Sequence, residues 1–202
     1  SLPEMNYTFD IKLSYGSVTG NSAGLGGGLF VSKGEVTSER SGNAVLEISQ
    51  NTGYQNGAGI YIQDGSLSMA NGNITENSIS GNGNGGGIFI ENGDFTINAG
   101  EISGNSVGNG NGGGVYIADD EDSVVDITGG VITGNTAVVE GGGVLVNSKS
   151  ILNVSGEPFI YGNSGAVGKN ILLYQDAAVK VTGTLKTGSG MDGAKLDISA
   201  KT

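Results

Sequence analysis

The sequence of 202 residues contains no cysteine, no histidine and no tryptophan, and it has only two prolines. Without cysteine, the chain has no disulfide framework, no thiol nucleophile and no thiolate metal site. Without histidine, it has no Ser-His-Asp triad and no histidine-ligated zinc. These absences exclude thiol and serine-triad catalysis as well as the common zinc sites.

Positive charge is also scarce, because nine Lys and Arg residues stand against 20 Asp and Glu residues and give a net charge of −11. Nucleic acids and anionic membranes need a basic protein surface, since counterion release from phosphates drives such binding. The sequence has no run of about 18 apolar residues that could span a bilayer. We therefore expect no nucleic-acid partner and no membrane insertion by this segment.

Glycine, in contrast, is abundant, with 40 residues that are concentrated in a repeat. Short Gly-rich segments, such as Gly85-Gly86-Gly87 and the variant Gly57-Ala58-Gly59, precede apolar triads. Successive triads start 27 to 31 residues apart. The six triads are Leu29-Phe30-Val31, Ile60-Tyr61-Ile62, Ile88-Phe89-Ile90, Val115-Tyr116-Ile117, Val144-Leu145-Val146 and Ile171-Leu172-Leu173. Since the triplets show no phosphate-loop or calcium-binding pattern, we interpret them as corner residues.

A second motif interleaves with the first and ends in an asparagine once per repeat. Its apolar residues alternate with polar ones over three to five positions, as in Phe95-Thr96-Ile97, which is typical of short strands. Stacked copies of three such strands would share one interior. The sequence therefore predicts an all-β fold, a right-handed parallel β-helix of about seven rungs, with residues 1–202 forming a single domain. The recurring asparagines are Asn21, Asn51, Asn77, Asn105, Asn135 and Asn163.

The asparagine column has two interpretations. It could be a row of ligand-binding amides, but asparagine also favours turns, and stacked copies pair amide to amide. We interpret the column as a structural asparagine ladder.

The middle residues of the triads form a second column, and alternation points them away from the core. An exposed aromatic strip could stack on sugar faces or mark a partner site. Alternatively, the rings stabilise the sheet as cross-strand pairs, or a neighbouring loop covers them. The hypothesis to be tested is that the aromatic members bind ligand; they are Phe30, Tyr61, Phe89 and Tyr116.

The sequence gives little support for catalysis or for metal binding. The acidic run Asp119-Asp120-Glu121-Asp122 could coordinate Ca²⁺, but one turn does not normally supply six oxygens, so a solvated turn is expected. A lyase needs a base and cations, yet Arg40 is the only arginine. A hydrolase needs two facing carboxylates, and Asp126 is the best placed carboxylate on a predicted strand. We expect no catalytic residues, no metal and no cofactor, with a β-helical carbohydrate-active enzyme as the alternative.

The repeats resemble a known pattern. The segment Ile132-x-x-Asn135 followed by Gly141-Gly142-Gly143-Val144 is similar to the repeats of bacterial surface β-helix proteins, including the chlamydial polymorphic outer-membrane proteins. Those repeats carry Phe-x-x-Asn and Gly-Gly-Ala-Ile/Val, where this chain has Ile or Val for Phe and Gly for Ala. The resemblance implies a non-catalytic, adhesin-like module that is extracellular, on the cell surface or secreted. It also implies a glycan or a host or matrix protein as partner, and a fragment of a longer surface protein.

Overall fold

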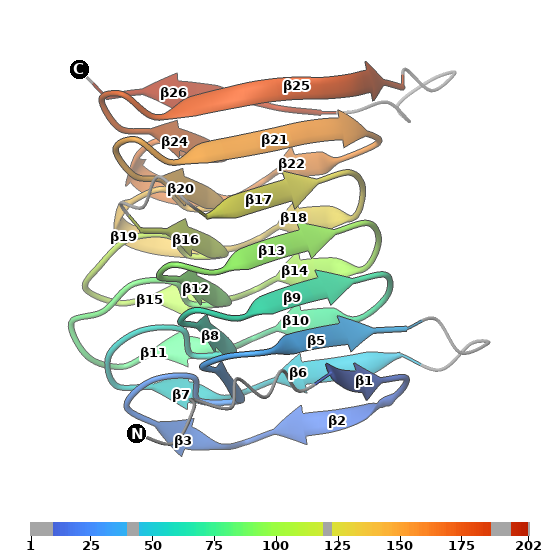
Figure 1. Cartoon of the computed structure of the whole chain (residues 1–202). Coiled ribbons are helices and arrows are strands. Elements are labelled where there is room, and N and C mark those ends of the chain that lie inside the picture. The colour runs from blue at the N-terminus through green and yellow to red at the C-terminus, as the bar shows by residue number, and fades with distance from the viewer. Residues whose placement is uncertain (1–9, 40–44, 119–122, 187–194, 202) are drawn as a thin grey trace, which may run out of the picture.

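The computed structural model describes residues 10–39, 45–118, 123–186 and 195–201. Within these residues every regular element is a β-strand, and the strands form four parallel sheets (Figure 1). The chain passes through sheets A, B, C and D in turn and then returns to sheet A one level higher, so that each circuit is one coil. The fold is therefore a right-handed parallel β-helix, as predicted.

Sheets A and B receive the first two strands of each coil. Sheet A contains β1 (Asp10–Leu13), β5 (Glu35–Ser38), β9 (Ser66–Met69), β13 (Asp94–Ile97), β17 (Val124–Ile127), β21 (Ile151–Gly156) and β25 (Ala178–Leu185). Sheet B contains β2 (Gly16–Thr19), β6 (Leu46–Ser49), β10 (Asn73–Thr75), β14 (Glu101–Ser103), β18 (Val131–Thr133) and β22 (Phe159–Tyr161).

Sheets C and D receive the other two strands. Sheet C contains β3 (Ser22–Ala23), β7 (Thr52–Gly53), β11 (Ser78–Ile79), β15 (Ser106–Val107), β19 (Thr136–Glu140) and β23 (Ser164–Val167). Sheet D contains β4 (Leu29–Val31), β8 (Ile60–Ile62), β12 (Ile88–Ile90), β16 (Val115–Ile117), β20 (Val144–Val146), β24 (Ile171–Leu173) and β26 (Ile198–Ala200).

Two details of the prediction are corrected. Six complete coils are present instead of seven rungs, because the described part of the seventh circuit forms strands only in sheets A and D. Each coil has four strands instead of three, because the residues after each ladder asparagine form a further short strand. The strand β15, for example, has two residues that pair with β11 and β19. A two-residue strand has too little alternation to be recognised in a sequence.

The core is a stack of apolar side chains that alternate inward along each strand. In sheet D the first and third residues of the triads point inward as predicted, and Ile60, Ile62, Ile88 and Ile90 are fully buried. Parallel registers place like residues on top of one another, for example Ile60 below Ile88. Burying one such side chain contributes roughly 1.5–3 kcal/mol. One continuous core therefore runs through the coils.

Glycine triplets form the corner before β4, β12, β16 and β20 of sheet D. Gly85, the first of its triplet, has a φ of 70°, in the left-handed region that favours glycine. For Gly87, the third, a Cβ would lie 2.6 Å from the carbonyl oxygen of Gly114 in the next coil. This corner thus needs glycine for two reasons, one conformational and one steric, which confirms the interpretation of the triplets.

Candidate functional site

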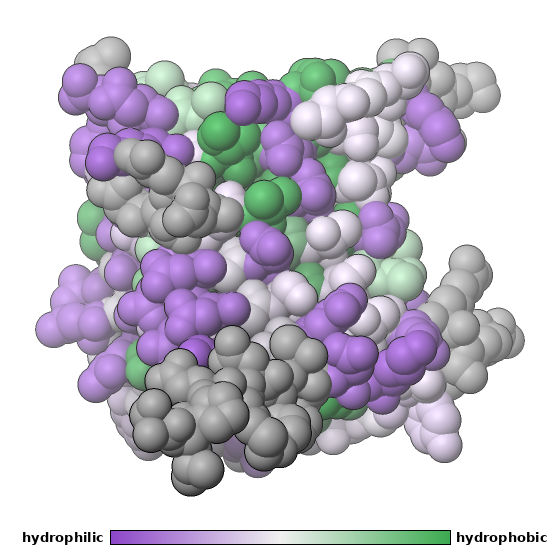
Figure 2. Space-filling view, in the orientation of Figure 1, coloured by the Kyte–Doolittle hydropathy of each residue, from purple (hydrophilic) through white to green (hydrophobic). Residues whose placement is uncertain are grey.

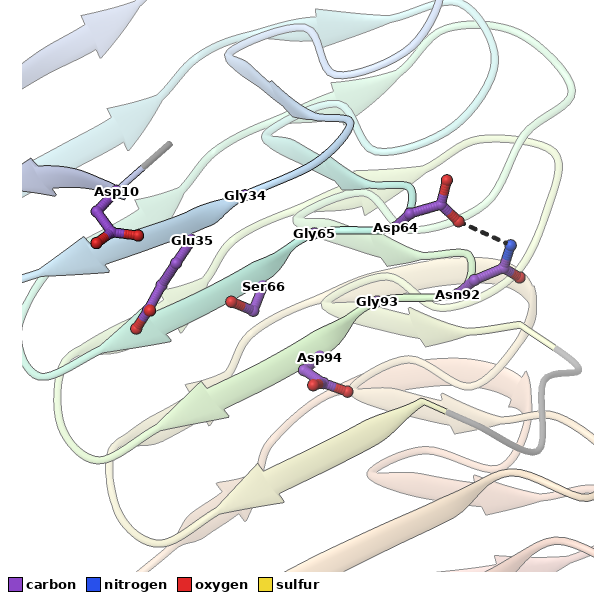
Figure 3. A pocket seen from close by; sticks show the side chains of 9 residues that line it. All are labelled: Asp10, Gly34, Glu35, Asp64, Gly65, Ser66, Asn92, Gly93 and Asp94. Atoms are coloured by element: carbon purple, nitrogen blue, oxygen red, sulfur yellow. Dashed lines mark hydrogen bonds between the residues drawn. The ribbon is translucent and has the colours of Figure 1, made fainter. Parts of the chain in front are cut away.

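A groove lies at the corner where sheet D leads into sheet A (Figure 3). Its volume is about 500 Å³, and its lining comes from four successive coils. The first residues of β1, β5, β9 and β13 line it with Asp10, Glu35, Ser66 and Asp94. We call this site the acidic groove.

The strand register produces this arrangement. Asp10 is paired with Glu35, Glu35 with Ser66, and Ser66 with Asp94, so the four residues form one column along the helix axis. Neighbouring members of a column are about 4.8 Å apart in a β-sheet. The rigid coils therefore fix the spacing of these side chains before any ligand arrives.

Glycines make the floor of the groove. Gly34, Gly65 and Gly93 directly precede β5, β9 and β13 of sheet A and line the groove; Gly34 is half-buried, and Gly65 and Gly93 are buried. A Cβ at Gly93 would lie 2.3 Å from the carbonyl oxygen of Gly65, so the close stacking of the coils leaves no room for a larger residue. At Gly65 and Gly93, the stacking of the coils therefore requires glycine.

The electrostatic character of the groove is negative. Four carboxylates line it, with no Lys or Arg among its described lining residues. Oδ1 of Asp64 accepts a hydrogen bond from Nδ2 of Asn92 at 3.2 Å, and Oδ1 of Asp94 accepts one from the backbone N–H of Val124 at 2.8 Å. Such a surface favours ligands that donate hydrogen bonds or carry positive charge, and it disfavours anions.

The aromatic column of sheet D, predicted as a ligand-binding strip, lies beside this corner. Its rings are stacked nearly parallel, with centroids 5.1 to 5.2 Å apart and interplanar angles of 6 to 10°. We call Phe30, Tyr61, Phe89 and Tyr116 the aromatic ladder. Each ring covers a face of its neighbour, which is the cross-strand stacking of the alternative interpretation.

The expectation that the aromatic ladder faces solvent is wrong for its centre. Tyr61 is 4% exposed and Phe89 is 7% exposed, because parallel stacking hides the ring faces. Phe30, at the end of the ladder, is 42% exposed, and Tyr116 is half-buried. Ligand binding by stacking on an open ring face is therefore restricted to the end at Phe30, and no finding here tests such binding.

Polar contacts fix the tyrosines of the ladder. The pKa of Tyr61 is raised above its ordinary value of 10.0. Burial of the hydroxyl is the largest cause, and a hydrogen bond to the Glu91 carboxylate is the next largest. Oε2 of Glu91 is itself buried without a hydrogen-bond partner. The hydroxyl of Tyr116 accepts a hydrogen bond from Nδ2 of Asn147 at 2.9 Å. The two hydroxyl groups thus serve the packing of the ladder.

The asparagine column is a structural ladder, as predicted. Nδ2 of Asn77 donates to Oδ1 of Asn105 at 2.9 Å, and Nδ2 of Asn105 donates to Oδ1 of Asn135 at the same distance. The ladder continues beyond Asn163 through Asn170, whose Nδ2 donates to a carboxylate oxygen of Asp197. Its central members are fully buried, so their amides cannot contact a ligand.

The remaining candidates do not join the groove. Arg40 and the acidic run at residues 119–122 lie outside the described residues. Asp126 lies between Thr96 and Asn153 in sheet A, without a carboxylate at either neighbouring position. In the part of the chain that the structure describes, no three acidic side chains are placed so that they could hold a metal ion.

The acidic groove was missed at the sequence level although a signal existed. Its residues occur in the equivalent segments Lys33-Gly34-Glu35, Asp64-Gly65-Ser66 and Asn92-Gly93-Asp94. Each segment places a polar or acidic residue after a glycine, just before an apolar strand. Aligning the repeats on this glycine would have shown the column.

Comparison with protein-family models found no match, and searches of curated proteins and of solved structures found none either. Across the described ranges, no helix has the length and apolar character needed to cross a membrane.

Proposed function

We propose that this chain is a non-catalytic, adhesin-like module that binds a neutral glycan in the acidic groove. The observation that carries the proposal is the groove itself, with four carboxylates, an amide and a hydroxyl on a rigid solenoid. The resemblance of the repeats to bacterial surface proteins supports a place outside the cell, on its surface or in secreted form.

The chemistry of the groove favours a polyhydroxylated ligand. Sugar hydroxyls donate hydrogen bonds, and hydrogen bonds to a carboxylate are roughly twice as strong as neutral ones. A glycan chain repeats its hydroxyls, as the column of Asp10, Glu35, Ser66 and Asp94 repeats its acceptors from coil to coil. Acidic polysaccharides are disfavoured by the same carboxylates. A neutral glycan lying along the helix axis meets these conditions.

The exposed end of the aromatic ladder supports the same proposal. Phe30 precedes Gly34 by four residues and is the ladder member that is clearly exposed. An aromatic ring can pack against the apolar face of a sugar. We assign Phe30 as the one ladder residue that offers such a contact, while Tyr61, Phe89 and Tyr116 hold the sheet together.

The experiment is a screen of neutral oligosaccharides, followed by calorimetric titration of the best binder. The double variant Glu35→Ala/Asp64→Ala removes two carboxylates from the groove and should weaken binding by at least about tenfold, or 1.4 kcal/mol. The double variant Glu47→Ala/Glu101→Ala is the matched control, because it removes the same charge from sheet B. The proposal fails if both double variants bind like the parent chain, or if only basic peptides bind.

One observation favours a second candidate, a glycoside hydrolase. Asp10 and Glu35 lie opposite each other on adjacent strands, and adjacent strands are about 4.8 Å apart. Retaining glycosidases hold their two carboxyl groups about 5–5.5 Å apart. If the chain releases reducing ends from a neutral polysaccharide and Glu35→Gln abolishes that release, the chain is a glycoside hydrolase and not a non-catalytic binding module.

A further inference from the structure

The column of sheet A that lines the acidic groove continues beyond the groove. Val124, whose backbone N–H donates to Oδ1 of Asp94 at 2.8 Å, is the next member of the column after Asp94. Val124 then pairs with Ile151, and Ile151 pairs with Ala178. The column is therefore polar over its first four strands and apolar over the next three.

The three apolar members of the column present hydrophobic surface next to the groove. Val125 and Leu152 are fully buried in the core, so alternation along the strands points Val124 and Ile151 outward. Val124 is 44% exposed, and Ile151 and Ala178 are half-buried. Because neighbouring strands are about 4.8 Å apart, the three residues span about 10 Å along the helix axis. We call Val124, Ile151 and Ala178 the apolar strip.

Polar residues border the apolar strip on sheet A. The next outward column along the same strands continues from Thr96 through Asp126, Asn153 and Lys180. Figure 2 shows hydrophilic residues gathered over the lower coils of one face and hydrophobic ones over its upper coils. The apolar strip is thus narrow, and it runs in line with the acidic groove instead of across the sheet.

From this change along one column, we propose that the ligand of the acidic groove is a neutral glycan linked to an alkyl chain, as in a glycolipid. This assignment rests on the proposed binding of a neutral glycan in the groove. The sugar lies between Asp10 and Asp94, and the alkyl chain lies on the apolar strip. One ligand can contact both parts, because the register places Val124 directly beside Asp94.

An alkyl chain suits the apolar strip better than a further sugar does. A sugar ring over Val124 and Ile151 would lose hydrogen bonds to water, and these side chains have no polar atoms to replace them. An alkyl chain gains by leaving water, and each buried methylene tightens binding by about fourfold. The strip thus selects for an apolar group at the end of the glycan that lies beside Asp94.

Glycosides that differ only in the group linked to the sugar test this assignment. The methyl and octyl glycosides of cellotriose, maltotriose and mannotriose are titrated calorimetrically, below the concentration at which the octyl compounds form micelles. For a sugar that binds, the octyl glycoside should bind at least about tenfold more tightly than the methyl glycoside. Its heat-capacity change should also be more negative, because apolar surface is buried. Equal affinities would overturn the assignment and leave glycan binding in the groove intact.

Two double variants locate the alkyl chain. Val124→Thr/Ile151→Thr keeps a β-branched side chain at both positions but makes the strip more polar. It should reduce the preference for the octyl glycoside to about threefold or less and leave the affinity for the methyl glycoside unchanged. Val138→Thr/Val167→Thr is the matched control, since these valines are 58% and 44% exposed but lie in β19 and β23 of sheet C.

The outcomes of this comparison are distinct. An octyl preference that survives in Val124→Thr/Ile151→Thr, or that is lost equally in the control, would overturn the assignment. Circular dichroism confirms that each variant has folded, and the single variant Val124→Thr replaces the double variant if the latter does not fold.

The groove variant Glu35→Ala/Asp64→Ala separates this assignment from the proposed function. It should weaken the binding of both glycosides to a similar degree, because the sugar occupies the groove in both. If it abolishes binding of the methyl glycoside but not of the octyl glycoside, the alkyl chain binds independently of the groove and the combined site is wrong. If no glycoside binds the parent chain, the proposed function fails, and this assignment fails with it.

Discussion

Asn105 and Asn135 join two coils through their side chains, with Nδ2 of Asn105 2.9 Å from Oδ1 of Asn135. The backbone N–H of Asn105 donates to the same oxygen at 3.0 Å, and Nδ2 also donates to the carbonyl oxygen of Ile74 at 2.8 Å. Buried backbone groups at a corner need partners, because no strand ladder pairs them there. One buried amide thus serves groups in three successive coils.

Replacing Asn105 by alanine should therefore destabilise the protein strongly. The change leaves the backbone N–H and Nδ2 of Asn77 without the oxygen that accepts them, and it removes the hydrogen bond from Nδ2 of Asn105 to the carbonyl oxygen of Ile74. At about 1–3 kcal/mol for each buried unpaired group, we expect a loss of about 3 kcal/mol or more in the free energy of unfolding. Urea denaturation of Asn105→Ala measures this loss.

The control for this prediction is Asn109→Ala in the same coil. Asn109 is exposed and bonds through its side chain to the exposed Asn82. Its replacement should change the free energy of unfolding by no more than about 0.5 kcal/mol. Equal losses in the two variants would show that burial within the ladder has no special effect.

A second prediction concerns the corner glycines. Gly87→Ala should be destabilising, because its Cβ would lie 2.6 Å from the carbonyl oxygen of Gly114 and 3.1 Å from Nδ2 of Asn105. We expect a loss of about 1–3 kcal/mol, as for other overpacked sites, measured by thermal or urea denaturation. Gly24→Ala is the control, since nothing lies within 4 Å of its added Cβ and its φ is not in the left-handed region. Gly24→Ala should be neutral or slightly stabilising, and similar losses in both variants would contradict the steric argument.

Because the sequence is repetitive, most of the fold could be predicted from it. The periodic triads, the glycine corners and the asparagines predicted the parallel β-helix, and the register confirms that like residues stack. The two-residue strands such as β15 could not be predicted, because two residues carry no periodicity. The incomplete last circuit was missed because its strands, β25 and β26, depart from the repeat in length and spacing.

The candidate site was less predictable. Alternation gives the direction of a side chain but not what covers it, so the sequence left two interpretations of the aromatic column open, and at Tyr61 and Phe89 the structure shows cross-strand stacking. The acidic groove depends on register between coils, which brings Asp10 and Glu35 together from positions 25 residues apart. A single repeat contains only one member of that column.

A third prediction follows from the burial of the aromatic ladder. Tyr61→Leu should lower the free energy of unfolding by no more than about 1.5 kcal/mol. The reason is that leucines, Leu145 and Leu172, are buried at the equivalent positions of two other strands of sheet D. Tyr61→Ala should cost about 3–5 kcal/mol, since it opens a gap between Phe30 and Phe89. Both are measured by urea denaturation, with the exposed Tyr54→Ala as a control that should have little effect. A small cost for Tyr61→Ala would mean that the stack contributes little to stability.

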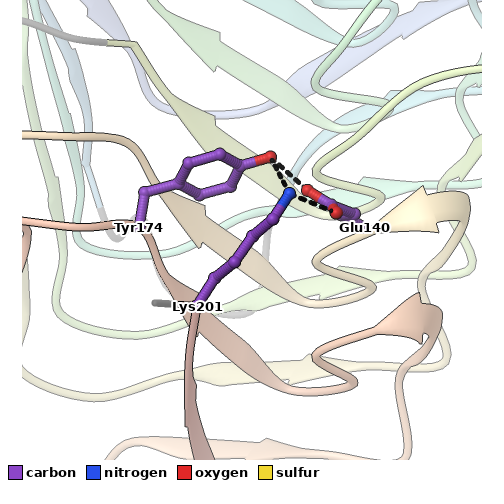
Figure 4. A network of polar contacts seen from close by, with 3 residues as sticks. All are labelled: Glu140, Tyr174 and Lys201. Carbon is purple, nitrogen blue, oxygen red and sulfur yellow. Dashed lines mark hydrogen bonds and ion pairs between the residues drawn. The ribbon is translucent and has the colours of Figure 1, made fainter.

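The last coil is fastened to the body by three side chains (Figure 4). Oε1 of the buried Glu140 is 2.7 Å from Nζ of Lys201, and the hydroxyl of Tyr174 donates to Oε2 of Glu140. The ammonium of Lys201 also lies over the ring of Tyr174, 4.7 Å from its centroid. Residues that follow β24 and β26 are thereby bound to the end of β19.

The protonation of Glu140 gives this contact a pH dependence. Burial raises the pKa of Glu140, but the hydrogen bonds from Lys201 and Tyr174 outweigh burial and bring it below the ordinary value of 4.5. Because the pKa of Glu140 is lower in the folded state than in the unfolded state, the ionised carboxylate stabilises the fold at pH values above the unfolded-state pKa. This stabilisation is lost as the pH falls through the folded-state pKa. We therefore expect Lys201→Met to lower the urea midpoint at neutral pH and to approach the parent chain as the pH falls below 4.5. Lys186→Met is the control, because its 3.7 Å pair with Glu157 is exposed on both sides and should matter little at any pH. A difference between Lys201→Met and the parent chain that stays constant down to acid pH would show that Glu140 is not the group involved.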